Sequence, residues 1–317
     1  MSQRTRTPPV PVPALASVER TANYPASVLD AMMSPGARAS AAPASTAAPS
    51  APAAPSVPAP ATARGYLPPV TPTAPAAPTA PATNTTAAAA ADPSLPPLEG
   101  IEVALFHGNA PPGGGRLLFI HESDSLRAAS YRVLRQRLRE NGNPRVIAVT
   151  SPRPREGKTR CAIDLAMSLA EHGRGRVLLV ETHLRSPRIA KALGFEPPAC
   201  FADQMAQHQR NPRLPWRVAA AFFPSFHVLA LAPNAGNWLL HEASFSLANE
   251  QLRRAGYSHI VLDCPPVLES ADVNILSDFA DGVLFAAHAR STTGDSLRDA
   301  VKQLAPANIL GTVLIND

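Results

Sequence analysis

In the segment Val146-Ile-Ala-Val-Thr-Ser-Pro-Arg-Pro-Arg-Glu-Gly-Lys-Thr159, an apolar strand pattern runs straight into a loop that ends Gly157-Lys158-Thr159. A helical pattern begins directly after this loop. In a phosphate-binding loop, backbone N–H groups and a helix N-terminus surround the phosphates, a lysine reaches the β and γ oxygens, and a hydroxyl ligates Mg²⁺. Lys158 and Thr159 have the spacing for these two tasks. The stretch therefore predicts a site for ATP and Mg²⁺.

The beginning of the loop departs from the strict pattern G-x-x-x-x-G-K-[ST]. Pro152 stands where the first glycine is expected, and Arg155 occupies a position where a backbone that approaches phosphates favours glycine. The further candidates for nucleotide binding in and just after the loop are Arg155, Glu156, Gly157 and Arg160.

Composition divides the chain of 317 residues in two. Residues 1–98 are rich in Pro, Ala, Thr and Ser and poor in aromatic residues, which predicts a disordered tail that cannot bury a core. Within this tail, the short amphipathic segment 17–33 is either a docking motif or a less biased piece of the same tail. Residues 99–317 have the composition of one globular domain.

Charge, cysteine content and hydropathy limit the partners and the compartment. The formal net charge is +5 and almost all basic residues are arginines, a usage that a GC-rich genome explains as readily as a ligand does, so no specific nucleic-acid partner is expected. Three widely spaced cysteines fit a reducing compartment better than a disulfide framework. No apolar run is long enough for a membrane span, and the N-terminus lacks a signal-peptide core, so we expect a cytoplasmic protein.

Helical and strand patterns alternate through the globular part. Strands are predicted at 146–150, 176–180, 226–230, 259–262, 282–288 and 309–315, and helices at 123–141, 161–172, 238–255, 274–280 and 293–304. In the first of these helices we expect Leu126, Leu134 and Leu138 to share one apolar face. The alternation predicts an α/β fold with a doubly wound, mostly parallel sheet of the P-loop NTPase type.

Polar residues follow three of the predicted strands, at 151–159, at 181–185 and at 263–266. In a doubly wound sheet these strand ends meet at the edge that binds ligands. Asp263 follows the buried run Ile260-Val-Leu262, so its carboxylate is expected to face Mg²⁺ as a Walker B acid. The segment Ser291-Thr-Thr293 is either an N-cap for the last helix, which capping preference favours, or a polar lip of the site.

These segments resemble a known family. Ser151-Pro-Arg-Pro-Arg-Glu-Gly-Lys-Thr159, Val177-Leu-Leu-Val-Glu-Thr-His-Leu-Arg-Ser-Pro187 and Tyr257-Ser-His-Ile-Val-Leu-Asp-Cys-Pro-Pro-Val267 are similar to the Walker A, A′ and B segments of bacterial tyrosine kinases of capsule and exopolysaccharide export. Ser130-Tyr-Arg-Val-Leu-Arg135 is similar to a helix that this family uses for oligomerisation. The wider class of MinD- and ParA-like ATPases shares the fold.

The resemblance implies roles for individual residues and partners. It implies Lys158, Glu181 and Asp263 as catalytic residues, Thr159 and Asp263 as ligands of Mg²⁺, and Arg185 as a contact to phosphate or a support of its loop. It further implies a membrane-bound chain-length protein, the polysaccharide co-polymerase, as a partner that would bring the chain to the membrane. The helix at 123–141 is the implied surface for homo-oligomers.

Several departures from the family pattern bear on catalysis. Where the family has D-x-D in its A′ segment, this chain has Glu181 and His183, and an imidazole is a poor ligand for a hard cation. Arg155 replaces a glycine of the loop, and Ala129 replaces the leading glutamate of the oligomerisation helix. The family's C-terminal tyrosine cluster is missing, since the tyrosines of this sequence are Tyr24, Tyr66, Tyr131 and Tyr257.

Three hypotheses for the function remain from the sequence. The first is an active tyrosine kinase in which Glu181 substitutes for the usual acid. The second is a degenerate kinase that senses ATP and regulates a membrane protein. The third is a ParA-like positioning ATPase, against which stands the lack of a second lysine early in the phosphate loop.

Overall fold

The computed structural model describes residues 95–106, 117–171, 173–232 and 238–316. The predicted tail up to residue 94, including the segment 17–33, lies outside the described residues. The strands are β1 (Ile101–Phe106), β2 (Val146–Thr150), β3 (Val177–Glu181), β4 (Trp216–Ala221), β5 (Phe226–Leu229), β6 (His259–Asp263), β7 (Gly282–His288) and β8 (Ile309–Ile315). The helices are α2 (Leu118–His121), α3 (Leu126–Glu140), α4 (Lys158–Ala170), α5 (Ile189–Leu193), α6 (Phe201–Arg210), α7 (Glu242–Arg254), η1 (Val267–Glu269), α8 (Asp272–Asp278) and α9 (Gly294–Gln303).

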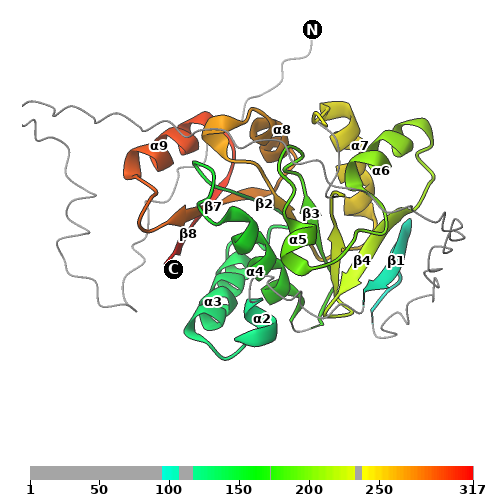
Figure 1. Cartoon of the computed structure of the whole chain (residues 1–317), viewed down its shortest axis with the longest axis horizontal. Coiled ribbons are helices and arrows are strands. Elements are labelled where there is room, and N and C mark those ends of the chain that lie inside the picture. Colours follow the sequence, from blue (N-terminus) through cyan, green and yellow to red (C-terminus); the bar gives the residue numbers. More distant parts are fainter. Residues whose placement is uncertain (1–94, 107–116, 172, 233–237, 317) are drawn as a thin grey trace, which may run out of the picture. The chain divides into compact units, whose positions relative to one another are not determined.

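The strands form one sheet in the order β1-β4-β5-β3-β6-β2-β7-β8. Every neighbouring pair is parallel except β4 and β5, which run antiparallel. Helices lie on both sides of the sheet: α2, α3 and α4 on one side, and α7, α8 and α9 on the other (Figure 1). The predicted doubly wound, mostly parallel α/β fold is therefore confirmed.

The central strands β2, β3 and β6 are buried along their entire length. Their apolar side chains alternate between two core layers, one shared with α3 and α4 and the other with α6, α7 and α8. A strand that is covered on both faces needs a continuous apolar run rather than an alternating one, which explains why these three segments were recognisable in the sequence.

The predicted strands agree with β2, β3, β5, β6, β7 and β8 to within one residue at each end. The predicted helices agree with α3, α4, α7, α8 and α9, with ends that shift by up to four residues. The sequence prediction missed β1 and β4. In β4 the run Val218-Ala-Ala-Ala221 gives little strand signal, because alanine has low β-propensity, and the strand is instead fixed by its pairing with β1.

Helix α3 buries a different face from the predicted one. Leu126 is 88% exposed at the start of the helix, whereas Ala128, Tyr131, Arg135 and Leu138 are buried. The prediction of one apolar face with Leu126 in it was thus wrong. The physical reason is that α3 packs on α4 through the face that carries Ala128, Tyr131 and Arg135, and Leu126, two residues before Ala128, lies on the opposite side of the helix.

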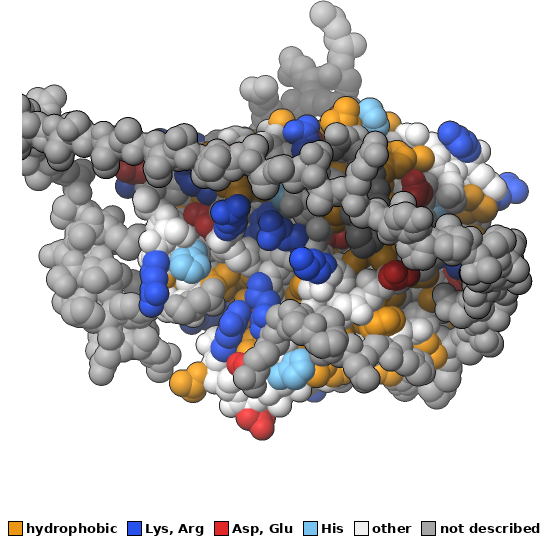
Figure 2. Space-filling model, in the orientation of Figure 1, with side chains coloured by type: hydrophobic (Ala, Val, Ile, Leu, Met, Phe, Trp, Pro, Cys, Tyr) orange, Lys and Arg blue, Asp and Glu red, His pale blue; other side chains and the backbone are white. Residues whose placement is uncertain are grey.

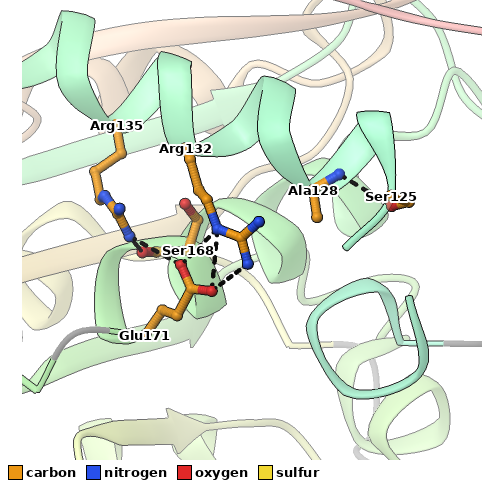
Figure 3. Close-up of polar contacts among 6 residues, drawn as sticks. All are labelled: Ser125, Ala128, Arg132, Arg135, Ser168 and Glu171. Atoms are coloured by element: carbon orange, nitrogen blue, oxygen red, sulfur yellow. Dashed lines mark hydrogen bonds and ion pairs between the residues drawn. The ribbon is translucent and has the colours of Figure 1, made fainter. Parts of the chain in front are cut away.

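Two arginines of α3 hold the end of α4 (Figure 3). Arg132 donates to both carboxylate oxygens of Glu171, and Arg135 donates to the same carboxylate at 3.2 Å and to the backbone carbonyl of Ser168. Ser125 caps the start of α3 by accepting from the backbone N–H of Ala128. Because α4 begins at the phosphate loop, this clamp fixes the helix on which the candidate site is built.

None of the helices in the described parts of the chain is both long enough and apolar enough to cross a lipid bilayer.

Candidate functional site

The carboxyl ends of three adjacent strands form the centre of the site. β6 lies between β3 and β2, and the register places Asp263 opposite Glu181 on one side and opposite Val149 on the other. The three polar segments that the sequence placed after these strands therefore meet at one edge of the sheet, as predicted. Backbone bonds continue beyond the strands, since the N–H of Val267 donates to the carbonyl of Ser151 at 2.9 Å.

Two residues of the loop between β2 and α4 have a left-handed backbone conformation. Gly157, the N-cap of α4, has φ +85°, and a side chain there would also meet the Cδ1 atom of Ile315 at 2.5 Å. Arg155 has φ +64°, in the left-handed region that favours glycine. The backbone conformation at position 155 is thus one that favours glycine, as the sequence predicted. Arg155 adopts this conformation at a cost in free energy.

Glu156 braces this loop from within. Its side chain is buried, and its carboxylate accepts from the backbone N–H of Arg153 at 2.7 Å and from the hydroxyl of Thr292 at 2.7 Å. Thr292 in turn accepts from the backbone N–H of His288 at 2.8 Å. Its neighbour Thr293 caps α9, as the sequence predicted. The turn between β7 and α9 is thereby tied to the phosphate loop.

Lys158, Thr159 and Asp263 lie together at the base of the site. Asp263 is 1% exposed, and burial raises the pKa of its carboxyl to about 7 against the opposing effects of Lys158 and of a hydrogen bond from Thr159. Its Oδ1 atom is buried and has no hydrogen-bond partner among the residues that the structure describes. Burial lowers the pKa of Lys158, and the charge of Asp263 raises it. This arrangement leaves one buried carboxylate oxygen of Asp263 without a hydrogen bond in the described structure.

Glu181 occupies the matching position at the end of β3 but is fully engaged. One carboxylate oxygen accepts from the backbone N–H groups of Arg188 and Ile189, and the other accepts from that of Leu231 at 2.9 Å. Burial raises the pKa of this carboxyl, and the three backbone bonds lower it. Glu181 thus holds the loop after β3 and the end of β5 in place.

His183 stands two residues further on and faces a positively charged environment. Burial, together with the charges of Lys158, Arg188 and Arg185, lowers its pKa to about 4. Its Nδ1 atom is buried and has no hydrogen-bond partner within the described residues. The imidazole is therefore neutral at physiological pH and adds no negative charge to the site.

A cavity of about 670 Å³ opens above these residues. The basic side chains that line it are Arg155, Lys158, Arg160, Arg185 and Arg188, and the acidic ones are Glu269 and Asp272. Figure 2 shows Lys and Arg side chains gathered near the middle of the face in view, where Figure 1 has α4 and α5. The excess of positive charge suits an anionic ligand.

The structure includes most of the predicted nucleotide-binding residues in this cavity. Arg155, Gly157, Lys158, Thr159, Arg160 and Arg185 line it, whereas Glu156, Glu181 and Asp263 are buried beneath or beside it. The sequence interpretation missed Arg188, Glu269 and Asp272. Arg188 was detectable as a basic residue only three positions after Arg185, but the two acids follow the Pro265-Pro266 turn, whose direction the sequence does not determine.

The described residues contain no group of three or more His, Cys, Asp or Glu side chains that could hold a metal ion. At nucleotide sites Mg²⁺ takes part of its coordination from the phosphates of the ligand.

The fold and this loop define the class of protein. A mostly parallel sheet, a Gly-Lys-Thr loop at the start of a helix and a buried aspartate on the neighbouring strand are the features of a P-loop NTPase-like domain. The kinase domain of the Escherichia coli tyrosine kinase ETK has the same fold, with a TM-score of 0.54 and 18% identity over 67% of this chain and 82% of that one.

Sequence comparison identifies the relatives more narrowly. The chain is 27% identical to the tyrosine-protein kinase YwqD of Bacillus subtilis, over 61% of this chain and 82% of YwqD. It is 26% identical to the succinoglycan biosynthesis transport protein ExoP of Rhizobium meliloti, over 54% of this chain but 22% of ExoP. No model of a protein family matches the sequence. The predicted resemblance to bacterial tyrosine kinases of polysaccharide biosynthesis is thus confirmed.

Proposed function

We propose that this protein binds ATP at the cavity above β2, β3 and β6 and acts as a tyrosine-kinase-like protein in exopolysaccharide or capsule biosynthesis. One observation carries the proposal: Lys158, Thr159 and the buried Asp263 meet at one sheet edge, beneath an arginine-rich cavity. The similarity to YwqD and ExoP supports the pathway. The backbone of the loop and the side chain of Lys158 would hold the phosphates.

The residues present fit Mg²⁺ through a small donor set. Thr159 offers a hydroxyl, and Asp263 offers a carboxylate whose Oδ1 atom has no hydrogen-bond partner among the described residues. Hard cations prefer such oxygen donors. When bound, the ion would neutralise negative charge on the phosphates and on a transferring phosphoryl group.

Phosphoryl transfer to a tyrosine is the part of the proposal at risk. The reaction needs a group that accepts the proton of the tyrosine hydroxyl, and the A′ segment is where the family places an acid for this task. Here both carboxylate oxygens of Glu181 already accept backbone N–H bonds, and His183 is a neutral imidazole with a low pKa. We therefore expect slow transfer or none, and Glu181 as catalytic acid or base stays a prediction.

The partner proposal rests on the relatives. ExoP is named for transport in succinoglycan biosynthesis, and the chain matches 22% of it. The proposed partner of this protein is a membrane-bound polysaccharide co-polymerase. Self-association through α3 would have to use residues other than Arg132 and Arg135, which bind Glu171 of the same chain. The exposed Leu126 and Val133 are the apolar residues of α3 available for it.

The central experiment measures ATP binding by calorimetry and phosphotyrosine formation by mass spectrometry on the full chain. Lys158→Ala should weaken ATP binding by at least about tenfold, because it removes a charged contact to the phosphates. The control Lys191→Ala deletes an exposed lysine of α5 outside the cavity lining and should bind as the wild type does. Wild-type protein that fails to bind ATP would refute the proposal.

A second experiment separates an active kinase from an ATP sensor. The double variant His183→Asp with Arg155→Gly returns an acid to the A′ segment and a glycine to the phosphate loop. If the chain is a degenerate kinase, ATP turnover should rise at least about tenfold over the wild type, since well-placed acid–base groups contribute on this scale or more. Fast phosphotyrosine formation by the wild type would instead identify it as an active kinase.

A further inference from the structure

Asp164 of α4 is a buried carboxylate that two arginines share. Its side chain is 0% exposed. Arg160, one turn earlier in the same helix, donates through its Nε atom to both carboxylate oxygens, at 3.2 and 3.0 Å. Arg127, in the first turn of α3, donates to the Oδ2 atom at 3.4 Å. One buried negative charge thus lies between positive charges from two helices that pack on each other (Figure 1).

The two arginines differ in what else they can reach. Arg160 directly follows Thr159 and lines the cavity, whereas Arg127 is not part of the cavity lining. The acids Glu269 and Asp272 also line the cavity, but neither forms an ion pair with Arg160 in the described structure. The guanidinium group of Arg160 therefore lies between one carboxylate, that of Asp164, and the space where the phosphates of a ligand would bind.

The buried carboxylate of Asp164 needs at least one of its two arginines. Burial raises its pKa, whereas Arg160, Arg127 and a hydrogen bond from the backbone of Leu118 lower it. A buried charge that loses its partner destabilises the fold strongly, because nothing then compensates for the lost hydration. A phosphate can therefore draw Arg160 away from Asp164 at low cost only while Arg127 still holds that carboxylate.

From this arrangement we infer that Asp164 is a positioning residue that shares Arg160 with the phosphates of ATP, and that Arg127 makes Arg160 available by holding Asp164. The inference rests on the proposed function, because it concerns ATP at the same cavity, and it leaves the Mg²⁺ ligands as proposed. Coupling between two binding events is reciprocal, so ATP that engages Arg160 strengthens the pair between Arg127 and Asp164. Occupation of the cavity thereby fastens the start of α3 to α4.

The test measures the dissociation constant of ATP in the presence of Mg²⁺, by calorimetry on the full chain. Asp164→Asn removes the charge that competes for Arg160 and keeps an oxygen that can accept a hydrogen bond, so the constant should fall about threefold to tenfold. Arg127→Gln should raise the constant by about the same factor, because Asp164 then depends on Arg160 alone. A merely structural role of Asp164 would not strengthen binding when the charge is removed.

The double variant isolates the coupling between the two residues. In the Asp164→Asn background, Arg127→Gln should leave the dissociation constant unchanged, since the carboxylate that links Arg127 to Arg160 is gone. Arg137→Gln is the matched control, because it removes the same charge from an exposed position of α3 and should not change the constant. Unchanged or weaker binding by Asp164→Asn would overturn the inference. If that variant does not fold, Arg127→Gln that binds as tightly as the wild type would overturn it.

Hydrogen exchange of the backbone amides in the first turns of α3 tests the link to that helix. ATP should slow this exchange in the wild type and leave it unchanged in Arg127→Gln, because the pair with Asp164 is then missing. An equal effect of ATP on both proteins would overturn the link. Failure of the wild type to bind ATP would refute the proposed function and the inference together, whereas binding that none of these variants alters would refute the inference alone.

Discussion

Glu181 and Asp263 are two buried carboxylates that lie opposite each other on neighbouring strands, yet their surroundings differ completely. Glu181 is 0% exposed and accepts three backbone N–H bonds, whereas Asp263 is 1% exposed and has an oxygen without a hydrogen-bond partner in the described structure. A buried polar group without a partner costs stability, so its persistence points to a ligand. The same position at a strand end therefore supports a loop in one case and offers a binding group in the other.

Two further glutamates belong with Glu181 as supports. Glu156 braces the phosphate loop through Arg153 and Thr292, and Glu171 accepts from Arg132 and Arg135 at the end of α4. Carboxylates thus hold both ends of the structure that leads from the phosphate loop into α4. The following predictions test whether these supports and the open Asp263 are as different as their contacts indicate.

The largest effect is expected for Glu181→Gln. The amide NH₂ group of glutamine cannot accept a hydrogen bond, so at least one buried backbone N–H loses its partner and the remaining bonds lose their charge. The free energy of unfolding should fall by about 3 kcal/mol, measured by urea denaturation. Asp263→Asn is the comparison variant and should stay within about 1 kcal/mol of the wild type, because it removes a charge that burial disfavours. Equal losses of unfolding free energy in the two variants would contradict the different roles of Glu181 and Asp263.

Next in size is Glu171→Gln, with a marked pH dependence. The hydrogen bond from Arg132 is the largest cause that holds the pKa of Glu171 below its ordinary value, so the ionised form stabilises the fold. This contribution is present above the ordinary pKa and is lost as the pH falls through the folded-state pKa. At neutral pH the variant should lose about 1–2 kcal/mol of unfolding free energy, and the difference should vanish in acid.

Glu140→Gln, on an exposed position of α3, controls for the loss of one negative charge. If the unfolding free energies of Glu171→Gln and the wild type differed by the same amount from acid to neutral pH, the ionised Glu171 would not stabilise the contact between α3 and α4.

A smaller effect is expected for Thr292→Val. The change removes the hydroxyl that donates to Glu156 and accepts from the backbone N–H of His288. We expect a loss of about 1 kcal/mol in unfolding free energy together with weaker ATP binding, because the phosphate loop loses a support. Thr312→Val, at an exposed position of β8, is the control. Unchanged stability and binding would show that Glu156 holds the loop without Thr292.

The smallest effect concerns Arg155, whose φ of +64° suits glycine. Arg155→Gly should raise the free energy of unfolding by up to about 1 kcal/mol, since it removes the steric cost of a side chain in the left-handed region. Arg153→Gly, two residues earlier in the same loop and outside that region, should lower it by about 0.5–1 kcal/mol. Thermal denaturation of both variants tests whether Arg155→Gly raises the stability and Arg153→Gly lowers it. A loss of stability in Arg155→Gly would mean that its guanidinium group contributes more than its backbone costs.

Much of the fold could be predicted because its central strands are buried on both faces. Such strands are continuous apolar runs, and each of β2, β3 and β6 is followed by the polar residues of the site. The weaker signals were missed or misjudged: β4 ends in an alanine run, and Leu126 has the spacing of a core residue but lies on the side of α3 opposite the buried Ala128. Local pattern does not reveal where a neighbouring element ends.

The sheet edge, the phosphate loop with Lys158 and Thr159, and the position of Asp263 in the neighbouring strand can all be predicted from the amino-acid sequence. These features are local, because each depends on a strand and on the few residues that follow it. The contacts of each charged group, in contrast, follow from the folded arrangement of the chain. The backbone N–H groups that donate to Glu181 lie 7, 8 and 50 positions away in the chain. The hydroxyl of Thr292, which donates to Glu156, lies 136 positions away. The hydrogen bonds of a carboxylate depend on which groups the folded chain brings close to it, and the spacing of residues in the sequence does not predict these groups.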